Sequence, residues 1–169
     1  MQVAETARLR IRWFDASDGA FVVELLNQPA WIRFIGDKGV RTHEDALRYL
    51  EHGPVAMYRQ TGFGLYAVDL KETGERIGMC GLIRREALPD VDLGFAFLPS
   101  FWRNGYALEA AGAVVSYGRR VLKLRRIIAI ASPDNDRSRK LLERLGFHFE
   151  RAVTLPPNGE MLDLYAAEQ

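Results

Sequence analysis

One stretch, residues 91–121, constrains the fold of this chain most, because it joins a strand to a long helix through a short turn. From Val91 to Phe97, apolar side chains occupy every second position, which is the alternation of a β-strand. Pro99 prevents this strand from continuing inside a sheet. From about Gly105 to Val121, small and apolar residues recur every three to four positions, which predicts an amphipathic helix. The turn between them is aromatic, basic and glycine-bearing.

This turn is a candidate anion-binding site. The first amides of a helix have no partner inside the helix, and the helix dipole places partial positive charge beside them. A phosphate group satisfies both features. Asn104 offers a competing interpretation, because an asparagine at this point is a good helix cap. The residues of the turn alone leave both interpretations open.

The common nucleotide-binding motifs do not account for the turn. The sequence contains no Gly-x-x-x-x-Gly-Lys-Ser/Thr. The stretch from Gly62 to Ala67 matches Gly-x-Gly-x-x-Gly/Ala, but it precedes a predicted strand. A dinucleotide-binding fingerprint follows a strand and opens a helix, so we reject this match.

Length and charge narrow the class of protein. A chain of 169 residues can bury a real core, and we expect residues 1–169 to form one domain. The formal net charge of +1 gives no support for a nucleic-acid or membrane partner. The sequence also shows no signal peptide and no apolar run long enough to span a bilayer.

The numbers of cysteines and histidines bear on disulfides, cellular compartment and metal binding. A single cysteine, Cys80, excludes an intrachain disulfide and favours a cytoplasmic protein. Its apolar neighbours predict a buried small hydrophobe. His43, His52 and His148 lack the spacing of metal ligands, so we expect no metal.

The remaining elements follow from alternation, capping and turn signals. Trp31, Phe34 and Ile35 are expected in a loop, and Gly53-Pro54 is expected to end the second helix. Gly78 and Gly81 predict a bulge or a close backbone approach. The expected order is β-α-α-β-β-β-α-β-α-β-β. The expected strands cover residues 6–13, 63–70, 76–84, 91–97 and 127–131, a stretch that begins at 147, and residues 161–167. The expected helices cover residues 21–26, 42–53 and 105–121 and the segment that ends before Gly146.

Two sequence blocks carry a family resemblance. Pro99 to Ala110 reads Pro-Ser-Phe-Trp-Arg-Asn-Gly-Tyr-Ala-Leu-Glu-Ala, and Asn135 to Phe147 has the form Asn-x-x-Ser…Leu-Gly-Phe. The first resembles the coenzyme A loop of the GNAT N-acetyltransferase superfamily, pattern Arg/Gln-x-x-Gly-x-Gly/Ala, and most closely its Rim-like, ribosomal-protein-type branch. Trp102 takes the Arg/Gln place, as in that branch, and Arg103 replaces the branch's first glycine. The second block resembles the segment after the family's fifth strand.

The resemblance covers nearly the whole chain and implies a fold and an activity. The fold is the α/β (α+β) acyl-CoA N-acyltransferase fold, a mixed, mostly antiparallel sheet with helices on both faces. The activity is transfer of an acetyl group from acetyl-CoA to a primary amine by direct attack in a ternary complex. The residues implied in binding the cosubstrate are Phe97, Leu98, Arg103, Asn104, Gly105, Tyr106, Ala107, Leu108 and Asn135.

Three residues are candidates for catalysis by the same resemblance. Asp92 holds the acidic position of the family's Glu-Ile-Gly-Tyr segment and is the candidate general base; the alternative is a plain polar residue on the other face of the strand. Ser138 matches the hydroxyl that protonates the leaving thiolate, and Asn135 matches a pantetheine or substrate contact. The alternative for both is helix capping. We interpret Glu109 as structural, because a carboxylate there complements the helix dipole.

The acceptor side is less defined by the sequence. In the family, the first two helices and their loop form one wall of the acceptor groove, which implies Trp31, Phe34 and Ile35 as substrate contacts; core packing is the alternative. The acceptor is a small amine or a protein N-terminus, and the oligomeric state, monomer or homodimer, is open. A coenzyme A-binding module without transfer activity is the rival function. Four basic residues are either phosphate contacts or solvated charges: Arg103, Arg137, Arg139 and Lys140.

Overall fold

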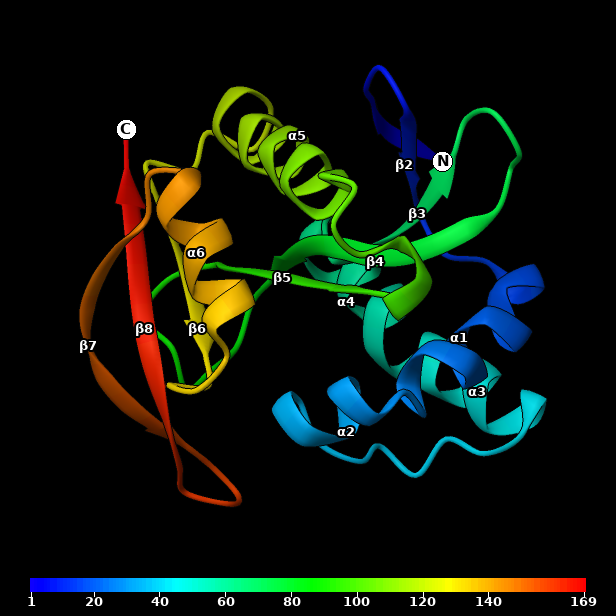
Figure 1. Ribbon diagram of the computed structural model, residues 1–169, viewed down its shortest axis with the longest axis horizontal. Helices are drawn as coiled ribbons and strands as arrows, with labels where there is room; N and C mark the ends of the chain where they lie inside the picture. Colours follow the sequence, from blue (N-terminus) through cyan, green and yellow to red (C-terminus); the bar gives the residue numbers. More distant parts are fainter.

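The computed structural model describes residues 1–169 and is built on an eight-stranded sheet (Figure 1). Its strand order is β1-β2-β3-β4-β5-β6-β8-β7, and every neighbouring pair is antiparallel except β5 and β6. The strands are β1 Gln2–Glu5, β2 Leu9–Arg12, β3 Leu65–Leu70, β4 Arg76–Ile83, β5 Asp92–Phe97, β6 Arg126–Ala131, β7 His148–Leu155 and β8 Glu160–Glu168. The helices are α1 Gly19–Leu26, α2 Pro29–Phe34, α3 His43–Leu50, α4 Ala56–Thr61, α5 Tyr106–Arg120 and α6 Asp136–Arg144.

Helices cover both faces of the sheet. On one face, α5 and α6 pack in a large apolar cluster, to which α5 contributes Ala110, Ala111 and Val114. On the other face, α1, α2 and α3 pack in a second cluster with Ala67 and Met79 of the sheet. The expected mixed, mostly antiparallel sheet with two helical layers is therefore confirmed. None of the helices combines the length and apolar character needed to cross a membrane.

The parallel pair β5 and β6 is the irregular part of the sheet. One pairing, Asp92 with Ile128, joins the two strands, and the Ile128 amide donates to the carbonyl of Val91 at 3.0 Å. Beyond Asp92 the strands separate, while β5 stays paired with β4 along its whole length. The sheet therefore opens on one side of β5, toward the turn that leads into α5.

Most predicted elements are confirmed. The strand and helix within residues 91–121 are β5 and α5, and β6 is buried on both faces, as its continuous apolar run predicts. Gly81 lies where the backbones of β3 and β4 approach, since a Cβ there would lie 2.1 Å from the carbonyl oxygen of Gly64. The pairing register of β3 and β4 also shifts at Val68, next to Gly78.

The loop expected around Trp31, Phe34 and Ile35 is wrong in part. Residues Pro29–Phe34 form helix α2, with Pro29 in its first turn. Proline suits that position because its missing N–H would have no helical partner and its φ is already helical. Pro29 was interpreted only as a stop for the preceding helix, whereas it also starts the next one.

The expected end of the second helix at Gly53-Pro54 is also wrong. The helical path continues from α3 through a wider π turn, Glu51–Val55, into α4, and it ends at Gly62 with φ +81°. A π turn changes the hydrogen-bonding pattern in the backbone, so it can pass a proline that lacks an N–H. Sequence analysis also missed β1, which pairs with β2, and the strand expected over residues 6–13 is the shorter β2.

A buried charge network fixes the start of α1 to the sheet. Asp18 is fully buried and accepts hydrogen bonds from Arg12 and Arg76, while Arg12 also bonds Asp69. Burial opposes the charge of Asp18, but the hydrogen bonds from Arg12 and Arg76 outweigh burial and lower its pKa below 3.8. This contribution to stability is present at neutral pH and is lost as the pH falls through the lowered pKa.

Replacing Asp18 tests this network. Asp18→Ala leaves two guanidinium groups beside a buried gap, so we expect a loss of about 3–5 kcal/mol in the free energy of unfolding, measured by urea denaturation at pH 7. Asp15→Ala is the control, since Asp15 is exposed, caps the short turn Ala16–Asp18 and lies only at the edge of the network, 3.9 Å from Arg12; it should cost about 1 kcal/mol. Equal losses for the two variants would contradict the assignment.

Candidate active site

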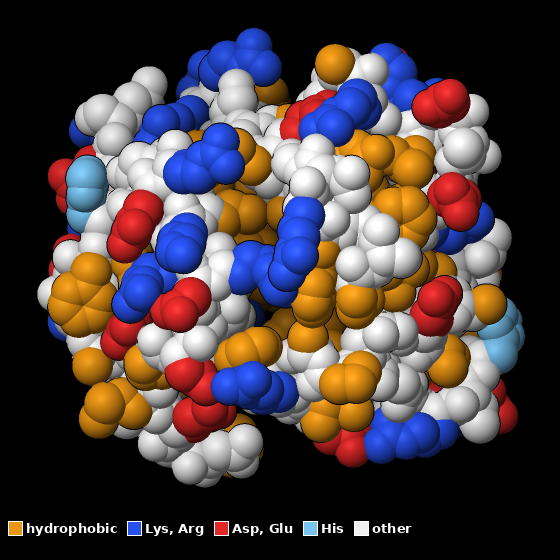
Figure 2. All heavy atoms as spheres, in the orientation of Figure 1, with side chains coloured by type: hydrophobic (Ala, Val, Ile, Leu, Met, Phe, Trp, Pro, Cys, Tyr) orange, Lys and Arg blue, Asp and Glu red, His pale blue; other side chains and the backbone are white.

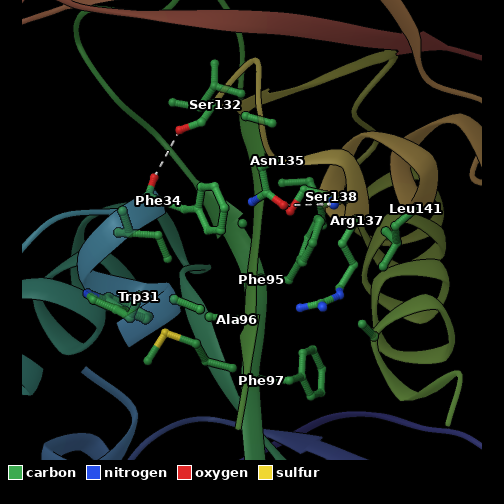
Figure 3. Close-up of a pocket in the computed structure, with 18 of the residues that line it drawn as sticks. Trp31, Phe34, Phe95, Ala96, Phe97, Ser132, Asn135, Arg137, Ser138 and Leu141 are labelled. Atoms are coloured by element: carbon green, nitrogen blue, oxygen red, sulfur yellow. Dashed lines mark hydrogen bonds between the residues drawn. The ribbon is translucent and has the colours of Figure 1, made fainter. Parts of the chain in front are cut away.

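A cavity of about 630 Å³ opens where β5 and β6 separate. Figure 2 shows a hollow at the centre of this face, with apolar side chains around it and lysine and arginine side chains at its opening. In Figure 3, β5 runs through the middle, with Trp31 and Phe34 on one side and Arg137, Ser138 and Leu141 on the other. The cavity therefore has one wall from α2 and another from α6.

The turn before α5 presents unbonded amides. Gly105, the residue before the helix, has φ +78° and Arg103 has φ +66°, so the turn takes a left-handed path. The side-chain amide of Asn104 donates back to the carbonyls of Phe101 and Trp102, so it does not cap α5. No hydrogen bond within the chain is found for the backbone amides of residues 103 to 108. The turn thus carries six N–H donors without a partner in the chain, at a helix N-terminus.

An ion pair joins the first turns of α5 to the segment between β1 and β2. Glu109 accepts hydrogen bonds from the Thr6 hydroxyl at 2.6 Å and from the Arg8 amide and Nε at 3.0 and 2.7 Å. Arg8 also donates to the carbonyl of Asn104 and lies over the ring of Tyr106. Glu109 therefore has the structural role expected from the sequence. It fixes the position of Arg8, which in turn bonds the Asn104 carbonyl of the turn.

Trp102 connects the turn to β5 and to α6. Its indole Nε1 donates to the carbonyl of Phe97 at 2.9 Å, and the guanidinium of Arg137 lies 3.6 Å from its ring centre. Arg103, Arg137 and Lys140 line the cavity. Arg139 does not line it and pairs with Asp136 at 2.9 Å, so for Arg139 the solvated-charge interpretation holds.

The open edge of β5 offers backbone groups to the cavity. The Leu98 amide donates to Ile77 of β4, and hydrogen bonding alternates along an antiparallel pair. The amides of Phe95 and Phe97 therefore point away from β4, toward the gap. Leu98 does not share this property, since its amide is bonded to β4 and its side chain is buried in the cluster beneath α1 to α3. Leu98 is not among the residues that line the cavity, and its contact with the cosubstrate stays a prediction.

Asp92 lies at the closed end of the gap. It is 1% exposed and its Oδ1 accepts a hydrogen bond from Arg85 Nε at 3.2 Å. Asp92, Gly94 and Ala96 share the face of β5 that meets α1 to α3, so the Asp92 side chain points toward these helices. Burial raises the pKa of Asp92 to about 6, although the charge of Arg85 acts in the opposite direction. A carboxyl with this pKa, lining a cavity, is a candidate base.

Asn135 and Ser138 lie together at the start of α6. The side-chain oxygen of Asn135 accepts a hydrogen bond from the Ser138 amide at 3.3 Å, which is the helix cap of the alternative interpretation (Figure 3). The cap uses neither the side-chain N–H₂ of Asn135 nor the hydroxyl of Ser138, and both residues line the cavity. Capping and ligand contact are therefore compatible here.

Trp31, Phe34 and Ile35 all line the cavity from α2 and its end. Trp31 is also packed in the second cluster and its indole N–H has no hydrogen-bond partner, whereas Ile35 is 46% exposed. Two contacts connect α2 across the gap to the turn after β6. The Ser132 hydroxyl donates to the Phe34 carbonyl at 3.5 Å, and Arg33 pairs with Asp134 at 3.0 Å.

Sequence analysis missed several lining residues. Arg85, Tyr49 and Met79 also line the cavity. Arg85 follows β4 by two residues, and the register of β4 with β5 places Ile83 opposite Asp92. The antiparallel pairing of these two predicted strands was therefore the signal that could have found Arg85. The described residues contain no group of three or more side chains able to hold a metal ion.

These features define a class of protein. A helix N-terminus with free amides, facing a gap between two parallel strands, is the arrangement that the GNAT resemblance implies. The family profile described as "Acetyltransferase (GNAT) domain" matches residues 8–148. The chain is 30% identical over 152 residues to YoaA of Bacillus subtilis strain 168, described as an uncharacterized N-acetyltransferase, covering 88% of this chain and 84% of that protein. The chain belongs to the GNAT acetyltransferase family and is an acyltransferase.

Solved structures agree with this assignment. A GNAT-family acetyltransferase from Bacillus anthracis is 27% identical, with a TM-score of 0.82 over 99% of this chain and 98% of that one. RimL, an α-N-protein acetyltransferase for ribosomal L7/L12 solved with coenzyme A, has the same fold, with a TM-score of 0.84 over 99% and 98% of the two chains and 18% identity. The predicted GNAT resemblance is confirmed, and Rim-type enzymes are among the proteins that share the fold.

Replacing Asp92 tests how its carboxylate is held. Because burial raises the pKa of Asp92 from 3.8 to about 6, the charged form is disfavoured in the folded protein at pH 7. We expect Asp92→Asn to raise the free energy of unfolding by about 1–3 kcal/mol at pH 7. The gain should shrink as the pH falls from 6 to 4, because the native carboxyl then becomes protonated.

Denaturant melts at pH 7 and pH 4.5 measure this effect. Asp90→Asn is the matched control, since Asp90 is a partly exposed partner of Arg126; it should change stability by less than about 1 kcal/mol at either pH. A clear loss of stability for Asp92→Asn at pH 7 would mean that the ion pair with Arg85 is a net stabilising contact.

Proposed function

We propose that this chain transfers an acetyl group from acetyl-CoA to a primary amine, by direct attack of the amine within a ternary complex. The observation that carries the proposal is the alignment of three features along one gap: the unbonded amides of residues 103–108, the open edge of β5 and the buried Asp92. Residues 1–169 act in this proposal as one catalytic domain, because one sheet carries all three.

The cosubstrate is held mostly by backbone. The amides of residues 103–108 take the diphosphate, with Gly105 and Ala107 allowing close approach, and Arg103, Arg137 and Lys140 are placed to meet further phosphate charge. The pantetheine arm enters between β5 and β6 and pairs with the amides of Phe95 and Phe97 as an added strand does. One of these amides is placed to stabilise the oxyanion. The Asn135 side chain contacts the arm or the acceptor.

The amine must lose a proton to react. An α-amino group has a pKa near 8 and a lysine ammonium one near 10, so a base is needed at neutral pH, more so for lysine. Asp92, with a pKa of about 6, is mostly ionised at pH 7 and takes this proton directly or through water. The pKa of Asp92 is closer to that of an α-amino group than to that of a lysine ammonium, so Asp92 is better suited to take a proton from an α-amino group.

The chemical step is balanced by these groups. The neutral amine nitrogen attacks the thioester carbon, the carbon–sulfur bond breaks, and the nitrogen gives up its second proton to solvent, so the product is an amide and a thiolate. The Ser138 hydroxyl protonates the thiolate and is reprotonated from solvent. A thiol has a pKa near 8.5, so the thiolate is a stable leaving group and needs only a weak proton donor. Orientation of the two substrates supplies much of the rate.

A charge reversal in the turn tests the binding site. Arg103→Glu places a carboxylate beside the diphosphate and should weaken coenzyme A binding by at least about tenfold, measured by calorimetry. Arg139→Glu changes the net charge equally but lies outside the cavity, so binding should change by less than about threefold. Equal weakening would indicate a general charge effect and contradict the placement of the diphosphate.

Removal of the base tests the chemistry. Asp92→Asn should lower kcat/KM by about 10²–10⁴ with coenzyme A affinity unchanged. In the native enzyme kcat/KM should rise with pH through about 6 as Asp92 ionises, and the variant should lack this rise. Thiol release from acetyl-CoA and product mass, with a panel of amines and peptides, are the measurements. Coenzyme A binding without acetylation of any amine would favour the rival, a silent binding module.

A further inference from the structure

Arg85 has hydrogen-bonding capacity that its own ion pair leaves unused. Its Nε donates to Asp92 at 3.2 Å, and this is the one hydrogen bond of its guanidinium within the chain. A guanidinium carries five N–H donors in a flat fork, so a second edge remains for another acceptor. Arg85 and Asp92 both line the cavity, and the side chain of Arg85 is 41% exposed. The unused edge therefore lies beside the proposed base.

The surroundings of this pair are apolar and aromatic. Gly94 and Ala96 continue the face of β5 that bears Asp92, so small residues form the floor there. Tyr49 lines the same part, and its hydroxyl lies near enough for the charge of Arg85 to act on it. The apolar lining residues on this side are Trp31, Phe34, Leu65, Met79 and Ile83.

We propose that the acceptor is an amino acid with a large apolar side chain, bound with its α-amino group at Asp92 and its carboxylate on the free edge of Arg85. The inference rests on the proposed function and names its substrate class. In an α-amino acid the two polar groups are adjacent, as Asp92 and Arg85 are. The side chain then lies against the apolar wall formed by Trp31, Phe34 and Met79.

The charges of the cavity argue against polycationic acceptors. Only Asp92 and Glu160 are acidic among the lining residues, and Asp92 is already paired. A polyamine or an amino sugar with several ammonium groups would find Arg85 and Lys38 on the acceptor side instead. A peptide N-terminus presents a neutral carbonyl where the amino acid presents a carboxylate. The carboxylate makes the stronger, charge-assisted hydrogen bond with Arg85.

Matched acceptors test the proposal. Phenylalanine, leucine and methionine are each compared with their carboxamide and with the amine that lacks the carboxylate, using purified protein and acetyl-CoA. For the best of the three we expect kcat/KM to exceed that of its carboxamide by at least about tenfold, which is the effect of one charge-assisted hydrogen-bond pair. Initial rates of thiol release and the mass of the acetylated product are the readouts.

A variant ascribes the preference to Arg85. Arg85→Met keeps most of the side-chain stem and removes the charge, so the ratio of kcat/KM for amino acid over carboxamide should fall to near one. The ratio is the right measure, because any effect of Arg85 on Asp92 changes both rates alike. Arg84→Met is the control; Arg84 bonds the Pro89 carbonyl outside the cavity, and its ratio should equal that of the native protein.

The outcomes separate this inference from the proposed function. If carboxamides are acetylated as well as the amino acids, the substrate class is wrong while acetyl transfer stands. If no amine is acetylated, the proposed function fails, and calorimetry of the three amino acids on the coenzyme A-loaded protein decides the inference alone. Binding that Arg85→Met weakens at least tenfold supports it, and no heat from any of the three overturns it.

Discussion

The separation of β5 from β6 is the constraint on which the site depends. A sheet normally pairs nearly every backbone amide, because an unpaired polar group away from water is costly. Here one pairing at Asp92 joins the strands, and the cavity-facing amides of β5 beyond it have no strand to meet. The gap persists because α5 and α6 pack against one face of the sheet and α1 to α3 pack against the other. A site built this way recognises an extended ligand by backbone first.

The two faces of β5 divide the cavity by chemistry. Cationic lining residues gather on the side of α5 and α6, where Arg103, Arg137 and Lys140 surround the unbonded amides. The side of α2 and α3 is aromatic and aliphatic, with Arg85 and Asp92 at its floor. Alternation along a strand produces this division directly, because Phe95 and Phe97 point to one face and Gly94 and Ala96 to the other. A shift of one residue in register would exchange the two surfaces.

Local signals were enough to predict the turn before α5 but not the part of the cavity beside α2 and α3. The alternation in Val91 to Phe97 and the small residues of α5 are local patterns, so the strand–turn–helix unit could be predicted with its bounds nearly correct. Asp92 was singled out by resemblance, but its burial depends on the pairing of β5 with β4 and β6 and on the helices that cover the sheet. Arg85 was missed because its position follows from the pairing of β4 with β5, which no local pattern contains.

The prolines show a second limit of local reasoning. Pro29 and Pro54 are both read as stops, yet Pro29 begins α2 and Pro54 is buried within a continuous helical path. Proline removes one donor and fixes one angle, and whether that ends a helix depends on which turn contains it. The π turn that admits Pro54 is a tertiary outcome, favoured once α3 and α4 both pack against the sheet.

Two buried aspartates show how environment assigns different roles to one side chain. Asp18 is fully buried between Arg12 and Arg76, and their hydrogen bonds lower its pKa. Asp92 is almost as buried but has one partner, Arg85, on one oxygen, and burial prevails and raises its pKa. A carboxylate that is bonded to two guanidinium groups, as Asp18 is, stabilises the fold and is too weak a base to take a proton near neutral pH. Incomplete pairing costs stability and leaves a carboxylate able to accept a proton near neutral pH, which is the property that a general base requires.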